Sequence, residues 1–147
     1  MQKGRAWLCV GPVFFCLLDG GLTLQGQSDA YWAGHYEQAN EANPLGLWPL
    51  QGHPLLFVAV LLCWVLVFCT AIFRLPANLA LPLSFAVQFG HTIGVATWLV
   101  RLGAFGWLAG ILLLLASRLV LDWAWQSSRL ADTSTCCEDS QARGVTA

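Results

Sequence analysis

Long apolar runs without a formal charge constrain this chain more than any other feature. Residues 55–73 contain no charged side chain, and in residues 77–100 the only titratable group is His91. About 20 apolar residues cross the hydrocarbon core of a bilayer. Residues 6–24 are interrupted only by Asp19, and residues 102–121 only by Arg118, whose long side chain can reach the headgroups. The sequence therefore predicts an all-α membrane protein, a four-helix transmembrane bundle with a short exterior loop helix. The predicted spans are about 6–24, 55–73, 77–100 and 102–121.

The composition agrees with a lipid environment. Hydrophobic residues make up 57% of the chain and charged residues 10%, whereas about 25% of the residues in ordinary soluble domains are charged. A net charge of -1 without a basic run excludes nucleic acid as a partner. The predicted partner is the lipid bilayer, and the sequence leaves open a homo-oligomer or a membrane-protein partner.

The first span has an alternative interpretation. Lys3 and Arg5 precede its apolar core, as in a secretory signal peptide. No small-x-small cleavage site follows, and the bulky Phe15 before Cys16 does not fit a lipoprotein cleavage box. We therefore expect an uncleaved helix.

The basic residues predict the orientation in the membrane, because they accumulate on the cytoplasmic side. Six of the seven basic residues fall on one predicted side, and Arg101 alone falls on the other. The six are Lys3, Arg5, Arg74, Arg118, Arg129 and Arg143. We therefore expect a multi-pass protein of the cell membrane with both termini in the cytoplasm and the 25–54 loop outside.

The end of the chain differs in composition from the rest. Residues 1–125 form the predicted transmembrane domain, and residues 126–147 are polar, with almost no large apolar side chain. Such a segment buries too little surface to offset the entropy of ordering, so a disordered cytoplasmic tail is predicted. Cys136 and Cys137 lie in this tail and could bind a soft metal or carry an acyl chain, although a plain tail is the simpler account.

Small residues suggest how the last two spans pack. Gly90 and Gly94 are four residues apart, and Gly106 and Gly110 repeat this spacing in the next span. Small residues at this spacing let membrane helices approach closely. We expect the third and fourth spans to pack through these faces, with a short turn near Arg101 and Leu102.

The polar residues inside the spans are the candidate site. Asp19 is followed four residues later by Thr23, on the same helical face. His91 lies about 20 Å into its own span, the same depth as Asp19, at about 1.5 Å of rise per residue. Asp19, Thr23, Gln88, His91 and Thr92 are thus predicted to form one polar cluster in the outer half of the bundle. If the first helix instead ends at Gly20, Asp19 lies at a wet interface.

The exterior loop supplies two more carboxylates. If residues 29–43 form a helix, Glu37 and Glu41 share one face, and Pro44 ends that helix. Asn43 and Pro44 would then form a rigid corner that directs Glu41 toward the mouth of the bundle. Glutamates and histidines here could bind a metal or relay protons, but their spacing matches no established ligand pattern, and a solvated acidic loop is the common alternative.

Five of these residues carry a resemblance. Asp19 and Thr23 match D-x-x-x-T, and Glu41, Asn43 and Pro44 match E-x-N-P, over about residues 15–75. This pattern resembles a family of bacterial integral membrane proteins of unknown function. The resemblance implies an integral membrane protein with a site in this region, and it implies no reaction.

Enzyme motifs are missing from the sequence. There is no G-x-S-x-G around a serine and no H-E-x-x-H for zinc, so the sequence leaves open whether the protein is an enzyme and whether it needs a cofactor. Two hypotheses remain. The protein is either a structural or interaction component whose polar cluster sets helix packing, or a transporter, proton relay or metal-dependent membrane enzyme that uses Asp19, Glu41 and His91.

Overall fold

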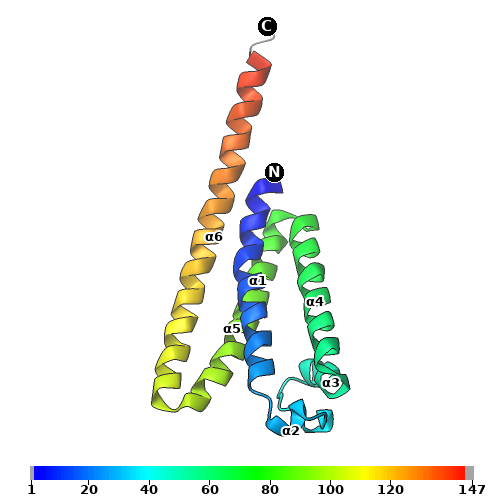
Figure 1. Ribbon diagram of the computed structural model, residues 1–147. Helices are drawn as coiled ribbons and strands as arrows, with labels where there is room; N and C mark the ends of the chain where they lie inside the picture. Colours follow the sequence, from blue (N-terminus) through cyan, green and yellow to red (C-terminus); the bar gives the residue numbers. More distant parts are fainter. Residues whose placement is uncertain (1, 145–147) are drawn as a thin grey trace.

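The chain folds into a bundle of four long helices with short helices at one end (Figure 1). The computed structural model describes residues 2–144, with side chains described for residues 4–129. In chain order the elements are α1 (Gln2–Gln25), α2 (Asp29–Trp32), the 3-10 turn η1 (Tyr36–Gln38), α3 (Pro44–Gly52), α4 (Pro54–Arg74), α5 (Ala77–Leu99), the 3-10 turn η2 (Val100–Leu102) and α6 (Ala104–Gly144). No strand occurs among the described residues, and the predicted all-α class is confirmed.

Four helices are long and apolar enough to cross a membrane. Their apolar stretches are Gly4–Gln25, Pro54–Arg74, Ala77–Leu102 and Ala104–Arg129. The first three agree with the predicted spans to within a few residues, and the fourth extends further than the predicted 102–121. By length and composition the chain is a multi-pass membrane protein.

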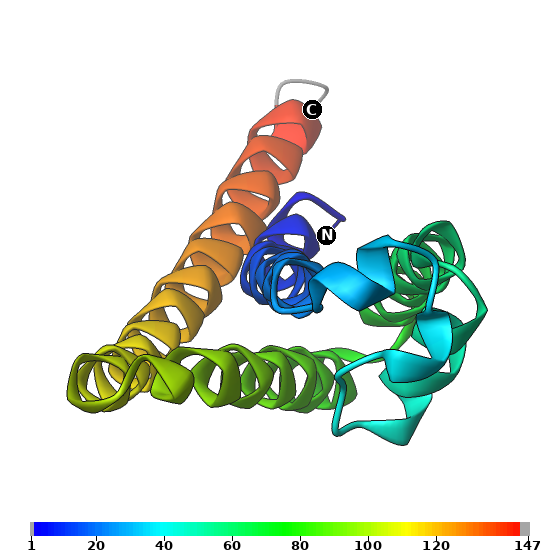
Figure 2. The same cartoon turned by 60° about the horizontal axis from the view of Figure 1, so that its bottom comes forward.

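Helices α1 and α5 form the centre of the bundle. Helix α1 packs against α4, α5 and α6, whereas α4 and α6 lie on opposite sides and do not touch within the described residues (Figure 2). Accordingly 44% of the apolar stretch of α1 is buried, against 17% for α4 and 22% for α6. We call the end that holds Arg5 and the α4–α5 turn the terminal end, and the end that holds residues 26–53 the loop end.

A proline inside α1 explains one contact of the core. Pro12 has no backbone N–H, so the carbonyl of Leu8, four residues earlier, has no helical donor. The Ser84 hydroxyl of α5 donates to that carbonyl oxygen at 2.7 Å. In lipid such a carbonyl must find a partner inside the protein, so Ser84 stabilises α1 and joins it to α5.

The paired glycines of α1 do not break the helix. Helix α1 continues through Gly20 and Gly21 to Gln25, so the alternative in which it ends early is wrong. A Cβ atom on Gly20 would lie 2.4 Å from Leu61 Cδ2, which shows how closely α1 and α4 approach here. Glycine at this position permits that contact, and Asp19 consequently lies inside a helix.

Arg5 fixes the terminal end. Its Nη1 atom donates to the carbonyls of Phe73 at 2.7 Å and Leu75 at 2.6 Å, where α4 ends. A cation at a helix C-terminus satisfies free carbonyl groups and interacts favourably with the helix dipole. The beginning of α1 is thereby bound to the α4–α5 turn.

The predicted glycine packing between α5 and α6 is half right. A Cβ on Gly106 would lie 1.8 Å from the Leu99 carbonyl oxygen, and one on Gly110 would lie 3.5 Å from the Ala96 Cβ, so both α6 glycines face α5. On α5, however, Gly90 meets nothing within 4 Å, and Gly94 faces α1. The turn itself is short, as expected, and is formed by η2.

The exterior loop differs from the single helix predicted for residues 29–43. Gly34 adopts φ 105°, in the left-handed region, and ends the helical segment that begins at Asp29. Pro44 starts α3 instead of ending a helix, with Asn43 as its N-cap in an extended conformation. Proline is favoured in the first turn because its missing N–H would have no partner there. Glu37 and Glu41 therefore do not share a helix face.

Helix α6 also differs from expectation. It continues to Gly144, through most of the segment 126–147 predicted to be disordered. Ser, Thr, Asp and Cys, which are weak helix formers, predominate in this segment. Its helical form therefore continues that of the apolar turns before it, because elongating an existing helix costs less than nucleating one. The side chains of Cys136 and Cys137 lie outside the described residues.

Candidate functional site

An ionisable pair lies inside the bundle near the loop end. Asp19 Oδ2 on α1 is 2.9 Å from His91 Nδ1 on α5. At about 1.5 Å per residue, Asp19 lies about 9 Å from the end of α1 and His91 about 12 Å from the end of α5. The contact predicted from matched depths is present. The side chains of Asp19 and His91 are 21% and 20% exposed, so the pair is largely but not completely buried.

The second nitrogen of His91 is also bonded. Trp64 Nε1 on α4 donates to His91 Nε2 at 3.2 Å. An indole N–H can only donate, so Nε2 must be the unprotonated nitrogen and Nδ1 must carry the proton. His91 is therefore the neutral Nδ1–H tautomer, donating to the Asp19 carboxylate. Trp64 is not among the residues that the sequence predicts for the site, although its indole N–H is the only nitrogen donor among the side chains between residues 55 and 73.

A glycine on α5 makes room for the carboxylate. A Cβ on Gly94 would lie 2.5 Å from both carboxylate oxygens of Asp19. A Cβ atom cannot approach a carboxylate oxygen so closely without a steric clash. Gly94 therefore forms the seat of Asp19, a role that differs from the helix packing expected from its spacing to Gly90.

A second polar layer lies further toward the loop end. Thr23 Oγ1, one turn after Asp19, donates to Glu41 Oε2 at 3.3 Å and accepts from Trp98 Nε1 at 3.1 Å. The Asn43 N–H donates to Glu41 Oε1 at 2.7 Å. Both carboxylate oxygens of Glu41 are thus occupied by neutral donors. The sequence suggested that Glu41 acts together with Asp19 and His91. In the structure Glu41 instead bonds to Thr23 and to the Asn43 backbone, and so anchors the loop to α1.

Other loop contacts hold this layer in place. Gln27 Nε2 donates to the carbonyls of Thr23 and Asn40 at 2.7 and 3.1 Å, and its Oε1 accepts from the Asn40 N–H at 2.7 Å. The buried Tyr31 hydroxyl donates to the Leu50 carbonyl at 3.1 Å. Burial, with Tyr36 as a smaller contribution, raises the pKa of Tyr31 above its ordinary value. The loop is therefore fixed in one conformation.

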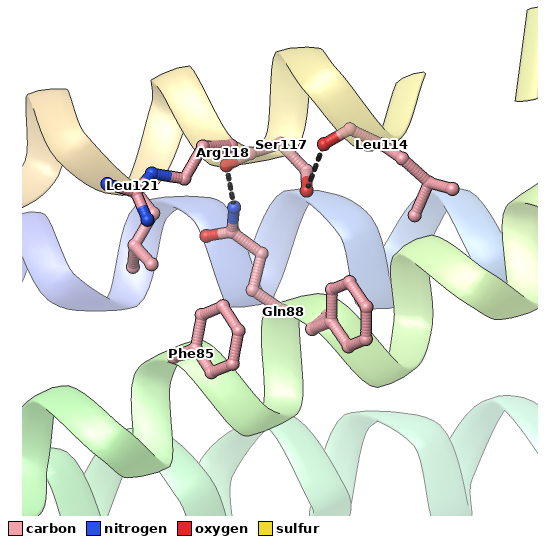
Figure 3. A pocket seen from close by; sticks show the side chains of 7 residues that line it. Phe85, Gln88, Leu114, Ser117, Arg118 and Leu121 are labelled. Carbon is pink, nitrogen blue, oxygen red and sulfur yellow. Dashed lines mark hydrogen bonds between the residues drawn. The ribbon is translucent and has the colours of Figure 1, made fainter. Parts of the chain in front are cut away.

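Two residues of the predicted cluster lie elsewhere. The buried Gln88 donates from Nε2 to the Ser117 carbonyl of α6 (Figure 3). The buried Thr92 donates to the Gln88 carbonyl at 2.7 Å. Gln88 Oε1 lies over Gly11, where a Cβ would be 2.0 Å away, so the amide fits against bare backbone of α1. Gln88 thus joins α5 to α6, Thr92 bonds within α5, and neither has a hydrogen bond to Asp19.

The remaining candidate is a surface residue. Glu37 Oε1 lies 3.3 Å from His35 Nδ1, and both side chains are more than 60% exposed. The described residues contain no group of three or more His, Cys, Asp or Glu side chains that could hold a metal ion. No observation on the described residues supports the metal-dependent version of the second hypothesis.

No family model, curated protein or solved structure matches this chain. The resemblance to a bacterial membrane family stays a prediction. The five residues that carry it nevertheless have defined structural roles here: Asp19 binds His91, Thr23 binds Glu41, Glu41 binds the Asn43 backbone, and Asn43 caps the helix that Pro44 begins.

Proposed function

We propose that this protein is a proton-relay or proton-coupled membrane protein in which the Asp19–His91 pair takes up and releases a proton. The observation that supports this proposal is the bonding of both ring nitrogens of His91, to Asp19 and to Trp64. An ionised Asp19 that accepts from this neutral His91 gives the pair one negative charge inside the bundle.

Proton uptake has a clear driving force. An uncompensated carboxylate inside a membrane is costly, and such residues mark proton or ion pathways in many membrane proteins. Uptake neutralises the pair, either on the second carboxylate oxygen of Asp19 or on His91 Nε2. Uptake on Nε2 requires the Trp64 N–H to leave, because two N–H groups cannot point at each other. Trp64 thus controls access to one of the two proton positions.

A structural role is supported for different residues. Ser84, Gln88 and Thr92 are buried and donate to backbone carbonyls of Leu8, Ser117 and Gln88. The Ser84 bond joins α5 to α1 and the Gln88 bond joins α5 to α6, whereas the Thr92 bond lies within α5. Interhelical bonds of this kind contribute about 0.6 kcal/mol each on average in membranes. The structural or interaction hypothesis therefore describes the scaffold that positions the ionisable pair.

The proposed location is the cell membrane, with both termini in the cytoplasm. Arg5, Arg74 and Arg129 belong to the terminal end, whereas Arg101 belongs to the turn at the loop end (Figure 1). The excess of basic residues at the terminal end supports its placement in the cytoplasm. Asp19 and His91 then open toward the outside, below the 25–54 loop.

Proton flux into proteoliposomes tests the proposal. The full chain is reconstituted with an internal pH dye, and a potassium gradient with valinomycin drives proton entry. We expect faster entry than in empty vesicles, reduced at least about tenfold in Asp19→Asn and in His91→Gln, since each removes a proton-binding group.

Two exposed loop residues supply matched controls. Asp29→Asn and His35→Gln make the same chemical changes outside the site and are expected to keep wild-type flux. Wild-type flux equal to that of empty vesicles would refute the proposal, as would equal flux in wild type and His91→Gln.

A further inference from the structure

A cavity of about 240 Å³ lies between α5 and α6, away from the Asp19–His91 pair. Phe85 and Phe89 of α5 and Leu114 and Leu121 of α6 form its apolar walls (Figure 3). Phe85 and Phe89 are stacked with 5.5 Å between ring centroids and are more than 40% exposed. Gln88, Ser117 and Arg118 complete the lining, so the cavity is a groove with apolar walls and a polar strip that opens on the lipid-facing side of the bundle.

One charged residue lines this groove. Arg118 Nε donates to Asp122 Oδ2 at 2.9 Å, and the two side chains are 68% and 43% exposed. A guanidinium group has five N–H donors, and among the described residues this bond is the only one that Arg118 makes. Its remaining donors face a medium without water unless they reach the headgroup region, and phosphate oxygens match their geometry.

Arg118 and Asp122 lie near the level expected for the lipid headgroups. Trp123, beside Asp122, contacts Trp7 of α1 edge to face, with 4.9 Å between ring centroids. Trp7 lies close to Arg5, which caps the end of α4, so this level is the terminal end of the bundle. Tryptophan gathers at membrane interfaces. The Arg118 side chain extends from within the span toward Leu121, and so toward this interface (Figure 3).

We propose that this groove binds a phospholipid with a phosphoethanolamine headgroup. The lipid phosphate binds the free N–H groups of Arg118, and its ammonium group binds the Asp122 carboxylate. One acyl chain lies in the groove between Phe85 and Leu121. This proposal does not depend on the proton site.

The two signs of charge select this headgroup. A phosphatidylglycerol headgroup offers only negative charge, which Arg118 attracts and Asp122 repels. A phosphatidylcholine headgroup carries a trimethylammonium group, which has no N–H to donate to Asp122. Of these three headgroups, only phosphatidylethanolamine satisfies both side chains with hydrogen bonds, and charge-assisted hydrogen bonds are the stronger kind.

Native mass spectrometry of the full chain tests the proposal, after extraction from vesicles with equal amounts of phosphatidylethanolamine, phosphatidylglycerol and phosphatidylcholine. Wild type is expected to retain phosphatidylethanolamine over either competitor by at least about fivefold. Arg118→Gln should abolish this preference, whereas Arg101→Gln, the same change at the loop end, should keep it. Asp122→Asn should shift the preference to phosphatidylglycerol, because an unopposed cation remains.

That shift separates a headgroup site from a structural ion pair, whose loss would not exchange one lipid for another. Helix content from circular dichroism checks that each variant is folded, and both residues are exposed enough to be replaced without loss of packing. Equal retention of the three lipids by wild type would overturn the proposal. Wild-type preference for phosphatidylglycerol, or an unchanged preference in Arg118→Gln, would also overturn it.

Discussion

Replacing Gly94 by alanine tests whether Asp19 is held where the structure places it. The new Cβ would lie 2.5 Å from both carboxylate oxygens of Asp19, whereas close carbon–oxygen contacts in proteins are about 3.3 Å or longer. The carboxylate must therefore move by about 0.8 Å or more. Since His91 and Gly94 are three residues apart on one face of α5, this movement also lengthens the 2.9 Å contact to His91 beyond hydrogen-bond range.

Gly90→Ala is the matched control, because a Cβ at that position meets nothing within 4 Å. Both glycines lie inside α5, so both alanines gain about 0.5–1 kcal/mol from the reduced entropy cost of the helix. Only Gly94→Ala loses the hydrogen bond between Asp19 and His91. We expect this loss to cost about 1–2 kcal/mol, a value between the average for hydrogen bonds in membranes and that for hydrogen bonds to charged groups. Gly90→Ala should stabilise the protein, and Gly94→Ala should be about 1–2 kcal/mol less stable than Gly90→Ala.

Reversible unfolding in mixed detergent measures this difference, and nitrogen NMR of His91 shows whether the Nδ1–H tautomer survives. We expect the tautomer in wild type and Gly90→Ala and a mixture of tautomers in Gly94→Ala, because the Trp64 N–H then favours Nδ1–H without the carboxylate that accepts from it. Equal stability of the two variants, within about 0.3 kcal/mol, together with unchanged His91 spectra, would refute the seating of Asp19 on Gly94.

Three further predictions concern the scaffold and the loop. Ser84→Ala should destabilise the wild type by about 1 kcal/mol but have little effect in Pro12→Ala, where the helix can supply its own donor; a double-mutant cycle with no coupling would contradict this explanation. The pKa of Tyr31 is raised in the folded state. The contribution of Tyr31 to the free energy of unfolding is therefore complete below the unfolded-state pKa of about 10 and is lost as the pH rises through the folded-state pKa. Unfolding in detergent from pH 7 to 11 should show this loss, and Tyr31→Phe should lack it. Glu41→Gln should loosen the loop, seen as faster amide exchange at residues 39–46, and leave proton flux unchanged; reduced flux would place Glu41 in the proton path.

The sequence predicts the spans well because a bilayer imposes a simple length rule. Three predicted spans agree with the helices to within a few residues, and the Asp19–His91 contact follows from depth alone. Depth does not specify which way a side chain points around the helix axis. Depth alone therefore groups Gln88 and Thr92 with His91, although Gln88 bonds to Ser117 of α6 and Thr92 bonds to the Gln88 carbonyl within α5.

The loop was harder to predict than the bundle. The interpretation of residues 29–43 as one helix relied on polar spacing, whereas Gly34 at φ 105° and the preference of proline for first turns decide the backbone. Trp64 and Trp98 were missed because an aromatic side chain in a span is ordinarily a lipid contact. Each has one N–H group that needs an acceptor in lipid, and that requirement is the signal that leads to His91 and Thr23.

The polar residues of the bundle divide by the kind of partner they bind. Ser84, Gln88 and Thr92 donate to backbone carbonyls, which do not change protonation, so their bonds are the same at every pH at which the protein is folded. Asp19 and His91 bind each other, and a proton added to either changes which atoms donate and which accept. Through Ser84 and Gln88 the first group joins α5 to α1 and to α6. In the relay proposed above, a proton taken up by the pair changes the contact with Trp64 on α4, the least buried of the four long helices, while these interhelical bonds keep their partners.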